Sequence, residues 1–476
     1  MAQITQAQYN TSKQTIRNVY IRVNLLNFNY LTIDSFSGNV IGGSLASDAN
    51  SNMRNTCDMT LVVTDSSFDV QAEGKIWLDR LIQVFIGVED MRTGEVSWTN
   101  KGIYLINQPT YTFDAKTNTM TFQGVDLMAL MTGLRGGMLT DSYIIPQGSN
   151  VRDAIIACLK ENGFTKYIVS ECTNIDGSIQ NVPYDIQHDA GDSWWDVLES
   201  LQGILPNYQM YFDIDGIFHY EVIPYRANEQ IRMSDDIWVQ NVTGESVSYD
   251  FESVKNSIKV LGKTHDIQYY PSTQTVSGGT LTLTIDALSE VKAGIMIGFT
   301  PPANMATAVS LNVNNSGAKA LRDSAGNQIT SLSKDVYYCA LYVGDDNYWM
   351  FLGHNQAVGE WKDNNPDSPF YVGNPAGEIK IVLYGDDYEN IMSDELAIAR
   401  AKWEIWQRCR LNDTVQLTTV PIYWAEVNWM VSYTPRGGSV ANQYLITSIQ
   451  TDLSQTGTQT YELVRYYPYY DENDIL

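Results

Sequence analysis

Short runs of β-branched and aromatic residues, separated by Asp, Asn, Gly and Ser, constrain the fold more than any other feature of this sequence. Five runs lie within the first 126 residues, and four lie close to the C-terminus. They are RNVYIRVNLL, TCDMTLVVTD, RLIQVFIGVED, GIYLINQPTYTF and NTMTFQGVD, then VQLTTVPI, NWMVSYTP, YLITSIQTD and TYELVRYYPYY. Such spacing is typical of β-barrels and β-sandwiches. We therefore expect a mainly β protein with a β domain at each end of the chain.

The middle of the chain changes character and predicts a smaller α+β domain. Asn150 is a suitable N-cap for a helix that Gly163 would end. A second helix begins at Ser193, with Asp196 three residues later in a capping-box pattern. The apolar stripe of this helix is Trp194, Val197, Leu198 and Leu201. A β-hairpin follows, with YQMYFD and IFHYEVI on either side of an Asp-Gly turn.

The strongest helix signal lies at residues 393–410. Ser393 is its N-cap, two acidic residues follow at its positive end, and Arg408 lies near its negative end. Positions that recur with helical spacing are Leu396, Ala399, Trp403, Trp406 and Arg410. We expect this stripe to pack on the C-terminal β domain, with Trp403 buried in the contact.

A short motif occurs twice in the chain. Tyr104-Leu105-Ile106 is followed by Thr119, Thr121 and Phe122, and Tyr444-Leu445-Ile446 is followed by Thr458, Thr460 and Tyr461, with a spacing that differs by one residue. One interpretation is that the chain holds two related β-barrels. The other is a chance likeness between two β-hairpins, because strand alternation alone generates such matches. The residues leave both interpretations open.

Charge and cysteine content exclude several classes of protein. The chain has 30 Lys and Arg against 55 Asp and Glu, a net charge of −25. Wrapping nucleic acid and docking on anionic lipid both depend on basic residues, so we expect neither. No stretch approaches about 18 consecutive apolar residues, so we expect no membrane-spanning segment. Five widely spaced cysteines without a CxxC pattern predict neither disulfides nor zinc, and indicate a reducing cytoplasm.

Motifs for catalysis are absent. The sequence lacks GxGxxG, GxxxxGK[ST], HExxH and GxSxG. His219 alternates with aromatic residues on a predicted strand, and the Asp213-x-Asp215-Gly216 segment fits a hairpin turn better than a calcium loop. His188-Asp189 has no nucleophile motif beside it. Counting carboxylates leaves a glycosidase open, but no pair stands out. We expect no enzyme, and no catalytic, cofactor or metal site.

Residues 268–356 differ from their surroundings. They are poor in charge and alternate strictly in GGTLTLTID and AVSLNVN, which predicts an inserted β-sandwich-like module. Tyr337, Tyr348 and Trp349 are candidates for contacts with a glycan, because exposed aromatic rings beside Asn and Asp suit sugar binding. The alternative is that these rings form the core of the module.

A pattern near the C-terminus carries a resemblance to a known family. Its residues are Asp387, Tyr388, Ile391, Ser393, Asp394, Leu396, Ala397, Arg400, Ala401, Leu411, Asp413, Val420, Pro421, Ile422, Val427 and Asn428. With GSLASDANSNMRNTCDMTLVV, DSWWDVLESL and YQMYFDIDGIFHYEVIP, it resembles the tail-hub proteins of phages that infect Gram-positive bacteria. The match covers most of residues 19–262 and 366–470. Asn55 departs from it, because the family has a basic residue at this position.

These patterns divide the chain into four parts. They are an N-terminal β-barrel hub domain at 1–136, an α+β middle domain at 137–236, a C-terminal β-barrel hub domain at 237–267 and 357–476 that contains the helix at 393–410, and the inserted module at 268–356. The module has its own resemblance, to a small β module that recurs in phage tail fibres. The matching segments are Leu311-Asn312-Val313-Asn314, Gly317-Ala318-Lys319 and Trp349-Met350-Phe351-Leu352-Gly353.

The hub family is similar to the baseplate hubs of T-even phages, in which three chains with two barrels each form a pseudo-sixfold ring. The resemblance implies a homotrimeric, structural virion protein that closes the distal end of the tail tube. It would adapt the sixfold tube to a threefold tip and form the channel through which DNA leaves. The implied partners are the distal tail, tail tube and tape measure proteins and a spike or fibre. The implied location is the distal tail or baseplate, after assembly in the host cytoplasm.

Two other functions compete with this one. A tail protein that binds a cell-wall glycan as receptor needs no hub motifs and would be a monomer. A tail-associated cell-wall hydrolase would carry an appended peptidase or lysozyme domain, whereas we expect this chain to end directly after its last strand.

Overall fold

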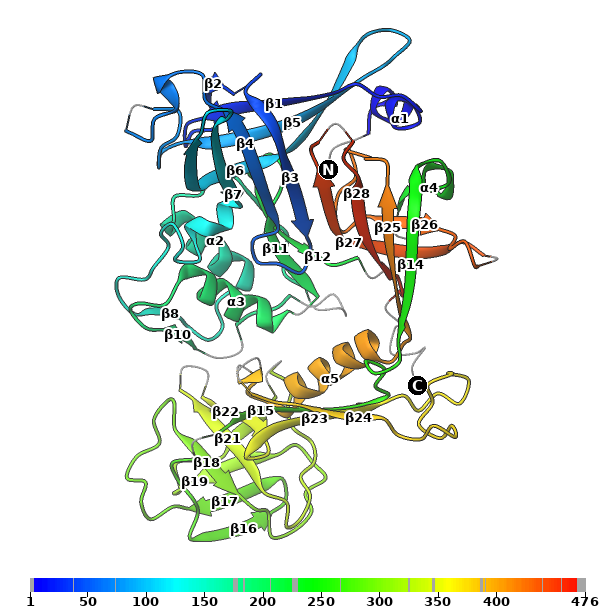
Figure 1. Cartoon of the computed structure of the whole chain (residues 1–476). Coiled ribbons are helices and arrows are strands. Elements are labelled where there is room, and N and C mark those ends of the chain that lie inside the picture. Colours follow the sequence, from blue (N-terminus) through cyan, green and yellow to red (C-terminus); the bar gives the residue numbers. More distant parts are fainter. Residues whose placement is uncertain are drawn as a thin grey trace.

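Strands dominate the fold, as the sequence predicts (Figure 1). The computed structural model describes residues 4–468 except 37, 73, 174–178, 183–184, 206, 225–229, 266, 324–325, 345–346, 386–387, 390, 439 and 455. Asp387 of the resemblance pattern therefore lies outside the described residues. Thirteen of the described strands form one large sheet, and smaller sheets of two, three, three and seven strands hold the others. None of the described helices has the length and apolar character needed to cross a membrane.

The N-terminal half of the large sheet follows a short helix, α1 (Gln6–Ser12). Its strands are β1 (Val19–Leu26), β2 (Thr32–Ser35), β3 (Val40–Asp48), β4 (Asn55–Val62), β5 (Leu81–Glu89), β6 (Val96–Phe113) and β7 (Asn118–Val125). Alternation places one face of most of these strands in a core, as β4 illustrates: Cys57, Met59 and Leu61 are buried while Asp58 is exposed.

The C-terminal half of the large sheet is built around a buried tryptophan. Its strands are β13 (Ile231–Met233), β14 (Val242–Asp250), β25 (Asn412–Thr419), β26 (Met430–Tyr433), β27 (Asn442–Asp452) and β28 (Gln459–Arg465). Helix α4 (Asp235–Asn241) inserts Trp238, which is 0% exposed, into this core. Its ring centroid lies 5.2 Å from that of Tyr461 and 6.0 Å from that of Tyr433.

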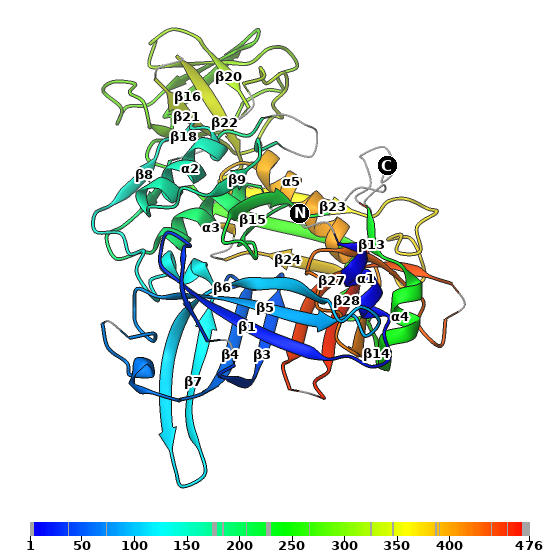
Figure 2. The same ribbon diagram turned by 90° about the horizontal axis from the view of Figure 1, so that it is seen from above.

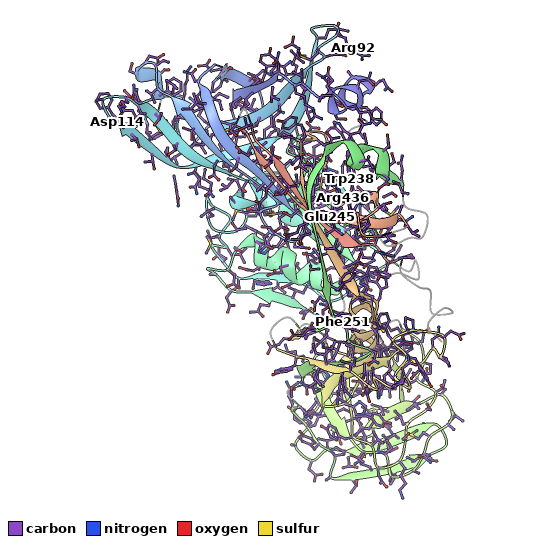
Figure 3. The ribbon with its side chains drawn as sticks, turned by 45° about the vertical axis from the view of Figure 1, so that its right-hand side comes forward. Arg92, Asp114, Trp238, Glu245, Phe251 and Arg436 are labelled. Carbon is purple, nitrogen blue, oxygen red and sulfur yellow. The ribbon has the colours of Figure 1, made fainter. Side chains whose placement is uncertain are left out.

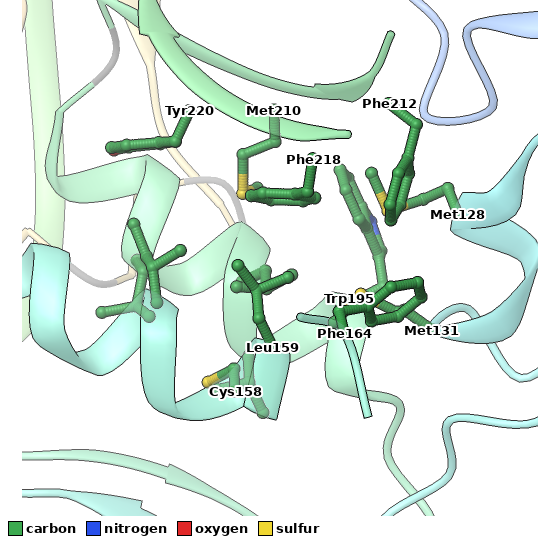
Figure 4. Close-up of a cluster of buried hydrophobic side chains, with 14 of the residues drawn as sticks. Met128, Met131, Cys158, Leu159, Phe164, Trp195, Met210, Phe212, Phe218 and Tyr220 are labelled. Atoms are coloured by element: carbon green, nitrogen blue, oxygen red, sulfur yellow. The ribbon is translucent and has the colours of Figure 1, made fainter. Parts of the chain in front are cut away.

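An α+β domain lies below the N-terminal half of the large sheet in the view of Figure 1. Its elements are β8 (Tyr143–Ile145), α2 (Val151–Glu161), β9 (Tyr167–Val169), β10 (Ile186–His188), α3 (Trp194–Ile204), β11 (Tyr208–Phe212) and β12 (Phe218–Val222). Asn150 caps α2, and Ser193 with Asp196 forms the predicted capping box of α3. The predicted stripe of α3 needs one correction: Trp195 packs near Phe164 and Phe212 in the core, while Trp194 is only half-buried (Figure 4).

The long helix α5 (Asp394–Arg408) begins after its predicted cap, Ser393, but does not pack on the C-terminal half of the large sheet. It lies on a separate three-stranded sheet, ordered β23 (Gln356–Lys362), β15 (Ser257–Thr264) and β24 (Lys380–Leu383). Ala397, Ala401 and Ile405 face that sheet, whereas Ala399 of the predicted stripe is exposed. The helix uses small residues because it packs very close to the strands.

The segment between β15 and β23 forms a module with its own seven-stranded sheet and core. Its strands are β16 (Thr273–Ser277), β17 (Thr280–Thr284), β18 (Met296–Phe299), β19 (Ser310–Val313), β20 (Lys319–Arg322), β21 (Tyr338–Val343) and β22 (Tyr348–Gly353). The segment leaves and re-enters at neighbouring residues, because Thr264 lies opposite Gln356 and the His265 N–H donates to the Asn355 carbonyl at 2.8 Å. In Figure 1 the module lies at the end of the molecule farthest from the N-terminal half of the large sheet.

Candidate assembly site

Two strands that are far apart in the sequence, β3 and β27, join the two halves of the large sheet (Figure 1). They are antiparallel, and Asp452 lies opposite Ser44. Beyond the last pair, the Leu453 N–H donates to the Gly43 carbonyl at 2.9 Å. Leu45, which lies opposite Thr451 in this contact, is 4% exposed. The two β domains thus share one hydrogen-bonded sheet, which the sequence does not predict.

The strand order of one half is repeated in the other. The N-terminal half has the order β3-β4-β7-β6-β5, and the C-terminal half has the order β14-β25-β28-β27-β26. Every neighbouring pair in both series is antiparallel. A chance likeness between two hairpins does not extend to five strands in the same order. The twice-occurring sequence motif therefore marks a repeat of the fold.

The repeat extends to the register of individual residues. In β3 a bulge follows Val40, and the regular pairing resumes at Gly42; in β14 a bulge follows Val242, and pairing resumes at Gly244. Since bulges interrupt a ladder at fixed positions, they align the two strands residue by residue. Ser246 in β14 is on this basis the equivalent of Ser44 in β3.

The tyrosines that begin the two motifs have the same role. Tyr104 in β6 is 1% exposed and donates its hydroxyl hydrogen to the Lys101 carbonyl at 2.6 Å. Tyr444 in β27 is 0% exposed and donates to a carboxylate oxygen of Asp413 at 2.8 Å. Burial raises the pKa of Tyr444 to about 12, so the hydroxyl stays protonated and able to donate. Each tyrosine fills the core of its half and has its polar atom satisfied there.

The face of the sheet that points away from these cores is mostly polar in strands β3, β4, β7, β14, β25, β27 and β28, with Val62, Leu445 and Val464 as apolar exceptions. None of the side chains on this face of the seven strands is basic. Its side chains alternate with the buried ones in the same strands. They include Ser44, Asp48, Asp58, Thr121, Gln123, Ser246, Ser248, Gln416, Gln450, Asp452 and Thr460. We call this set the polar face. Ser, Thr, Gln and Asp leave it without a site for phosphate.

Two basic side chains, Lys101 and Arg17, tie the two halves together beside the junction. Lys101 of β6 is 9% exposed and donates to the Tyr423 carbonyl at 2.9 Å, across the boundary between the halves. Burial lowers the pKa of Lys101, and the nearby Glu426 carboxylate opposes this shift. Arg17 donates to the Asn241 side-chain oxygen at 2.7 Å and to the Pro421 carbonyl.

A second polar contact joins three parts of the chain. Arg54, just before β4, donates to the Gln209 side-chain oxygen at 2.8 Å, and Asn428 donates to the same oxygen at 2.5 Å. The Arg54 guanidinium also lies 3.6 Å from the ring centroid of Tyr211. The resemblance expects a basic residue at position 55, and the structure supplies this charge from Arg54, one residue earlier. Asn428, which belongs to the resemblance pattern, thus links the C-terminal half to the Gln209 oxygen that Arg54 also binds.

His219 is bound on both sides by carboxylates. Its Nδ1 lies 2.8 Å from Glu221 Oε1 and its Nε2 lies 3.0 Å from Asp213 Oδ2, while the ring stacks on Tyr211 with centroids 5.0 Å apart. Burial by itself lowers the pKa of His219, but the two hydrogen bonds outweigh this and raise the pKa to about 9. The ring is therefore a cation at neutral pH. The alternation of His219 with aromatic residues in the sequence predicts that it lies on a strand, but it does not predict the two carboxylate partners.

His188 lies between a serine and a carboxylate. Its Nε2 is 3.0 Å from Ser200 Oγ, and its Nδ1 is 3.2 Å from Asp192 Oδ2, so the sequence pair with Asp189 is not the one that forms. The connectivity is that of a Ser-His-Asp triad. However, Ser200 lies inside α3, whose backbone N–H groups are bonded within the helix. Such a serine has no free backbone donors for an oxyanion hole. In the described part of the chain, no three His, Cys, Asp or Glu side chains can hold a metal ion.

The structure does not bring the three candidate glycan residues to one surface. Trp349 is 0% exposed in the core of the module, with its ring 5.0 Å from that of Tyr342, so its proposed glycan contact is corrected to a core role. Tyr348 and Tyr337 are half-buried and pack on the opposite side of the module sheet. The Arg322 guanidinium lies 5.5 Å from the Tyr348 ring.

Comparisons with known proteins agree with this architecture. Residues 367–470 match a family described as a domain of unknown function, DUF5048. No curated protein matches the chain. The 43 kDa tail protein of prophage MuSo2 from Shewanella oneidensis is 11% identical, with 93% of this chain and 98% of that chain covered and a TM-score of 0.50. The tail protein from Neisseria meningitidis MC58 is 10% identical, with 94% and 96% covered and a TM-score of 0.51. The chain has the fold of phage tail proteins.

Some sequence patterns identify strands and contacts of this fold, and other contacts have no pattern that predicts them. The twice-occurring Tyr-Leu-Ile motif locates β6 and β27, and the pattern around Asn428 marks a residue that contacts Arg54 through Gln209. No local signal identifies β3 as the partner of β27. The register of the two bulges, which begin at Val40 and Val242, is the feature that aligns the halves, and a search for Val-x-Gly in both would find it.

Proposed function

We propose that this protein is a structural hub of a phage tail. Three copies form a ring of six similar β halves at the distal end of the tail tube, and the ring adapts the sixfold tube to a threefold tip. Its partners are the distal tail, tail tube and tape measure proteins on one side and a spike or fibre on the other. It resides in the distal tail or baseplate of the virion, after assembly in the host cytoplasm.

The repeat of strand order and register carries this proposal. A sixfold tube presents six equal positions at its end, and a chain with two similar halves can occupy two of them. Three copies then match the tube while the rest of each chain keeps threefold symmetry. The junction of β3 with β27 supports this, because it already joins two halves side by side in one sheet.

The polar face supports a channel for DNA. If it lines the ring, DNA meets Ser, Thr, Gln and Asp side chains and no Lys or Arg from these strands. Binding of DNA depends on cations that replace its counterions, so such a surface lets the phosphates pass without holding them.

The mass of the purified protein tests the proposal. We expect light scattering to give three times the chain mass of 53.5 kDa, and electron micrographs of the particle to show a ring with six similar lobes. A protein that stays monomeric when tail tube and distal tail proteins are added would contradict it.

Receptor binding by the module is the second candidate function. Tyr270 is 59% exposed, and its ring centroid lies 6.5 Å from that of Tyr337, which offers a pair of aromatic rings to a sugar. We expect the full chain to bind purified host cell walls if this surface is used. Replacement of Tyr270 by Ala should then reduce binding, while replacement of Tyr384, which is 72% exposed and lies outside the module, should not.

Cell-wall hydrolysis is the third candidate function, and we expect a test for this activity to be negative. Zymography of the pure protein on host peptidoglycan should give no cleared band. If a band appears, Ser200→Ala decides whether the Ser200–His188–Asp192 chain produces it.

A further inference from the structure

Among the described strands of the large sheet, the distal part of β6 and the whole of β14 each have one edge without a partner strand. The distal part of β6, residues 110–113, pairs with β7 on one side, while β5 pairs with β6 only up to Leu105. At the other end of the sheet, β14 pairs with β25 alone among the described strands. Figure 2 shows the hairpin of β6 and β7 extending from the body. In Figure 3 Asp114, at its turn, lies far from Phe251, which follows β14.

We infer that β14 of one copy pairs with the distal part of β6 in the next copy. The strands are antiparallel, and Thr112 lies opposite Ser246. This inference rests on the proposed ring and names the contact that builds it. The partner is a second copy of this chain.

The junction inside the chain supplies the template and the register. In the repeat, β6 is the equivalent of β27 and β14 is the equivalent of β3, and β27 pairs with β3. Thr110 lies opposite Thr121 of β7, and Gln450 lies opposite Thr460 of β28. Because the twice-occurring motif aligns Thr121 with Thr460, Thr110 is the equivalent of Gln450, and two residues later Thr112 is the equivalent of Asp452. Since Asp452 lies opposite Ser44, the equivalent of Ser246, the template places Thr112 opposite Ser246.

Exposure of apolar side chains supports the same pairing. At the internal junction Thr451 is 2% exposed and Leu453 is 8% exposed. Their equivalents on the free edge, Tyr111 and Phe113, are 54% and 71% exposed. Large aromatic rings on an unpaired edge are unusual in a chain that stays alone. A neighbouring β14 would cover them as β3 covers their equivalents.

The hydrogen-bonding groups also match. The Leu453 N–H donates outward to Gly43, whereas the Asp452 N–H donates back to its own hairpin. By equivalence the N–H groups of Tyr111 and Phe113 point outward, and that of Thr112 points into the hairpin. The pair of Thr112 and Ser246 is therefore a position without direct backbone bonds, where opposite side chains lie closest.

A cysteine pair tests this register directly. We expect the Thr112→Cys/Ser246→Cys double variant to form disulfides between copies on mild oxidation, because opposite residues at such positions suit disulfide geometry. The product should be a covalently closed trimer. The matched control is Thr112→Cys/Val247→Cys, whose side chains would lie on opposite faces of the sheet and should not cross-link. Four of the five native cysteines are buried, and the single-cysteine variants correct for background.

Tyr111→Pro provides a second test, because it removes an outward N–H without removing a bond of the hairpin. We expect a chain that still folds, as shown by an unchanged circular dichroism spectrum, but no longer forms trimers. A particle of three copies without the cross-link overturns the strand pairing and leaves the hub proposal standing. Cross-linked ladders beyond three copies support the pairing and overturn the closed ring. A monomer without cross-links overturns both.

Discussion

Gly359 on β23 lies directly beneath Ala397 on α5. A Cβ atom at position 359 would lie 2.1 Å from the Ala397 carbonyl carbon and 2.3 Å from its oxygen. Both are backbone atoms, which cannot turn aside as a flexible side chain can. The missing side chain at Gly359 therefore sets the distance between the helix and its sheet.

We expect Gly359→Ala to lower the free energy of unfolding by roughly 1–3 kcal/mol, because the added methyl group forces the helix away from the sheet. Gly203→Ala is the matched control, since a Cβ there meets no atom within 4 Å and Ala favours the helix. Urea unfolding of both variants measures the difference. Equal stabilities would show that α5 can shift without loss.

Trp403 on the same helix gives a second prediction. It is 3% exposed, and its ring centroid lies 4.6 Å from that of Trp406. We expect Trp403→Ala to cost about 3–5 kcal/mol, because the cavity it leaves is large. Ile398→Ala on the exposed side of the helix should cost much less. A thermal melt of Trp403→Ala that matches the wild type would place this ring outside the core of the folded chain.

The charged cluster around His219 predicts a pH dependence of stability. The folded pKa of about 9 lies above the ordinary value of 6.5, so the folded state binds the proton more tightly. The stabilisation is fully present below pH 6.5 and is lost as the pH rises through 9. We expect His219→Gln to lower the free energy of unfolding more at pH 6.5 than at pH 9.5. A difference that does not change with pH would mean that the ring acts only by stacking on Tyr211.

Local signals predict what local interactions determine. Asn150 accepts a hydrogen bond from the Asp153 N–H at 3.2 Å, and Gly163 adopts a φ of +77°, so the ends of α2 follow directly from the sequence. The packing of α5 does not, because the buried face consists of Ala397 and Ala401 and depends on Gly359 in another strand. A prediction of the buried face of α5 from its large apolar residues misses this contact, because small residues make it.

Contacts between distant segments are harder to predict. β3 contains Gly42 and Gly43, which lower its strand propensity, and its partner β27 lies some four hundred residues later. The position of His219 on its strand follows from alternation, but Asp213 reaches the ring from the turn. In the candidate site the motif of Tyr104 and Tyr444 gives a repeat as one of two interpretations, and only the paired strands establish the repeat and show how its two copies meet.

The module is the subject of the last prediction, and its attachment suggests how to remove it. It leaves the chain after Thr264 and returns at Gln356, and these two residues are paired in β15 and β23. The insertion thus replaces the turn of a β-hairpin. A short Gly/Ser turn in place of residues 266–354 would restore that hairpin without moving either strand.

We expect the shortened chain to stay soluble and to form the same trimer as the full chain, because the module has its own sheet and its own core. Its described contacts with the rest of the chain are few. Among them, His354 Nδ1 lies 2.6 Å from Asp394 Oδ2, and Gln147 Nε2 lies 3.4 Å from Met350 Sδ. Losing them should lower the melting temperature by only a few degrees. Light scattering and a thermal melt measure both properties. An insoluble or monomeric product would mean that the module strands support the hub itself, whereas loss of cell-wall binding with an intact trimer would assign the receptor contact to the module.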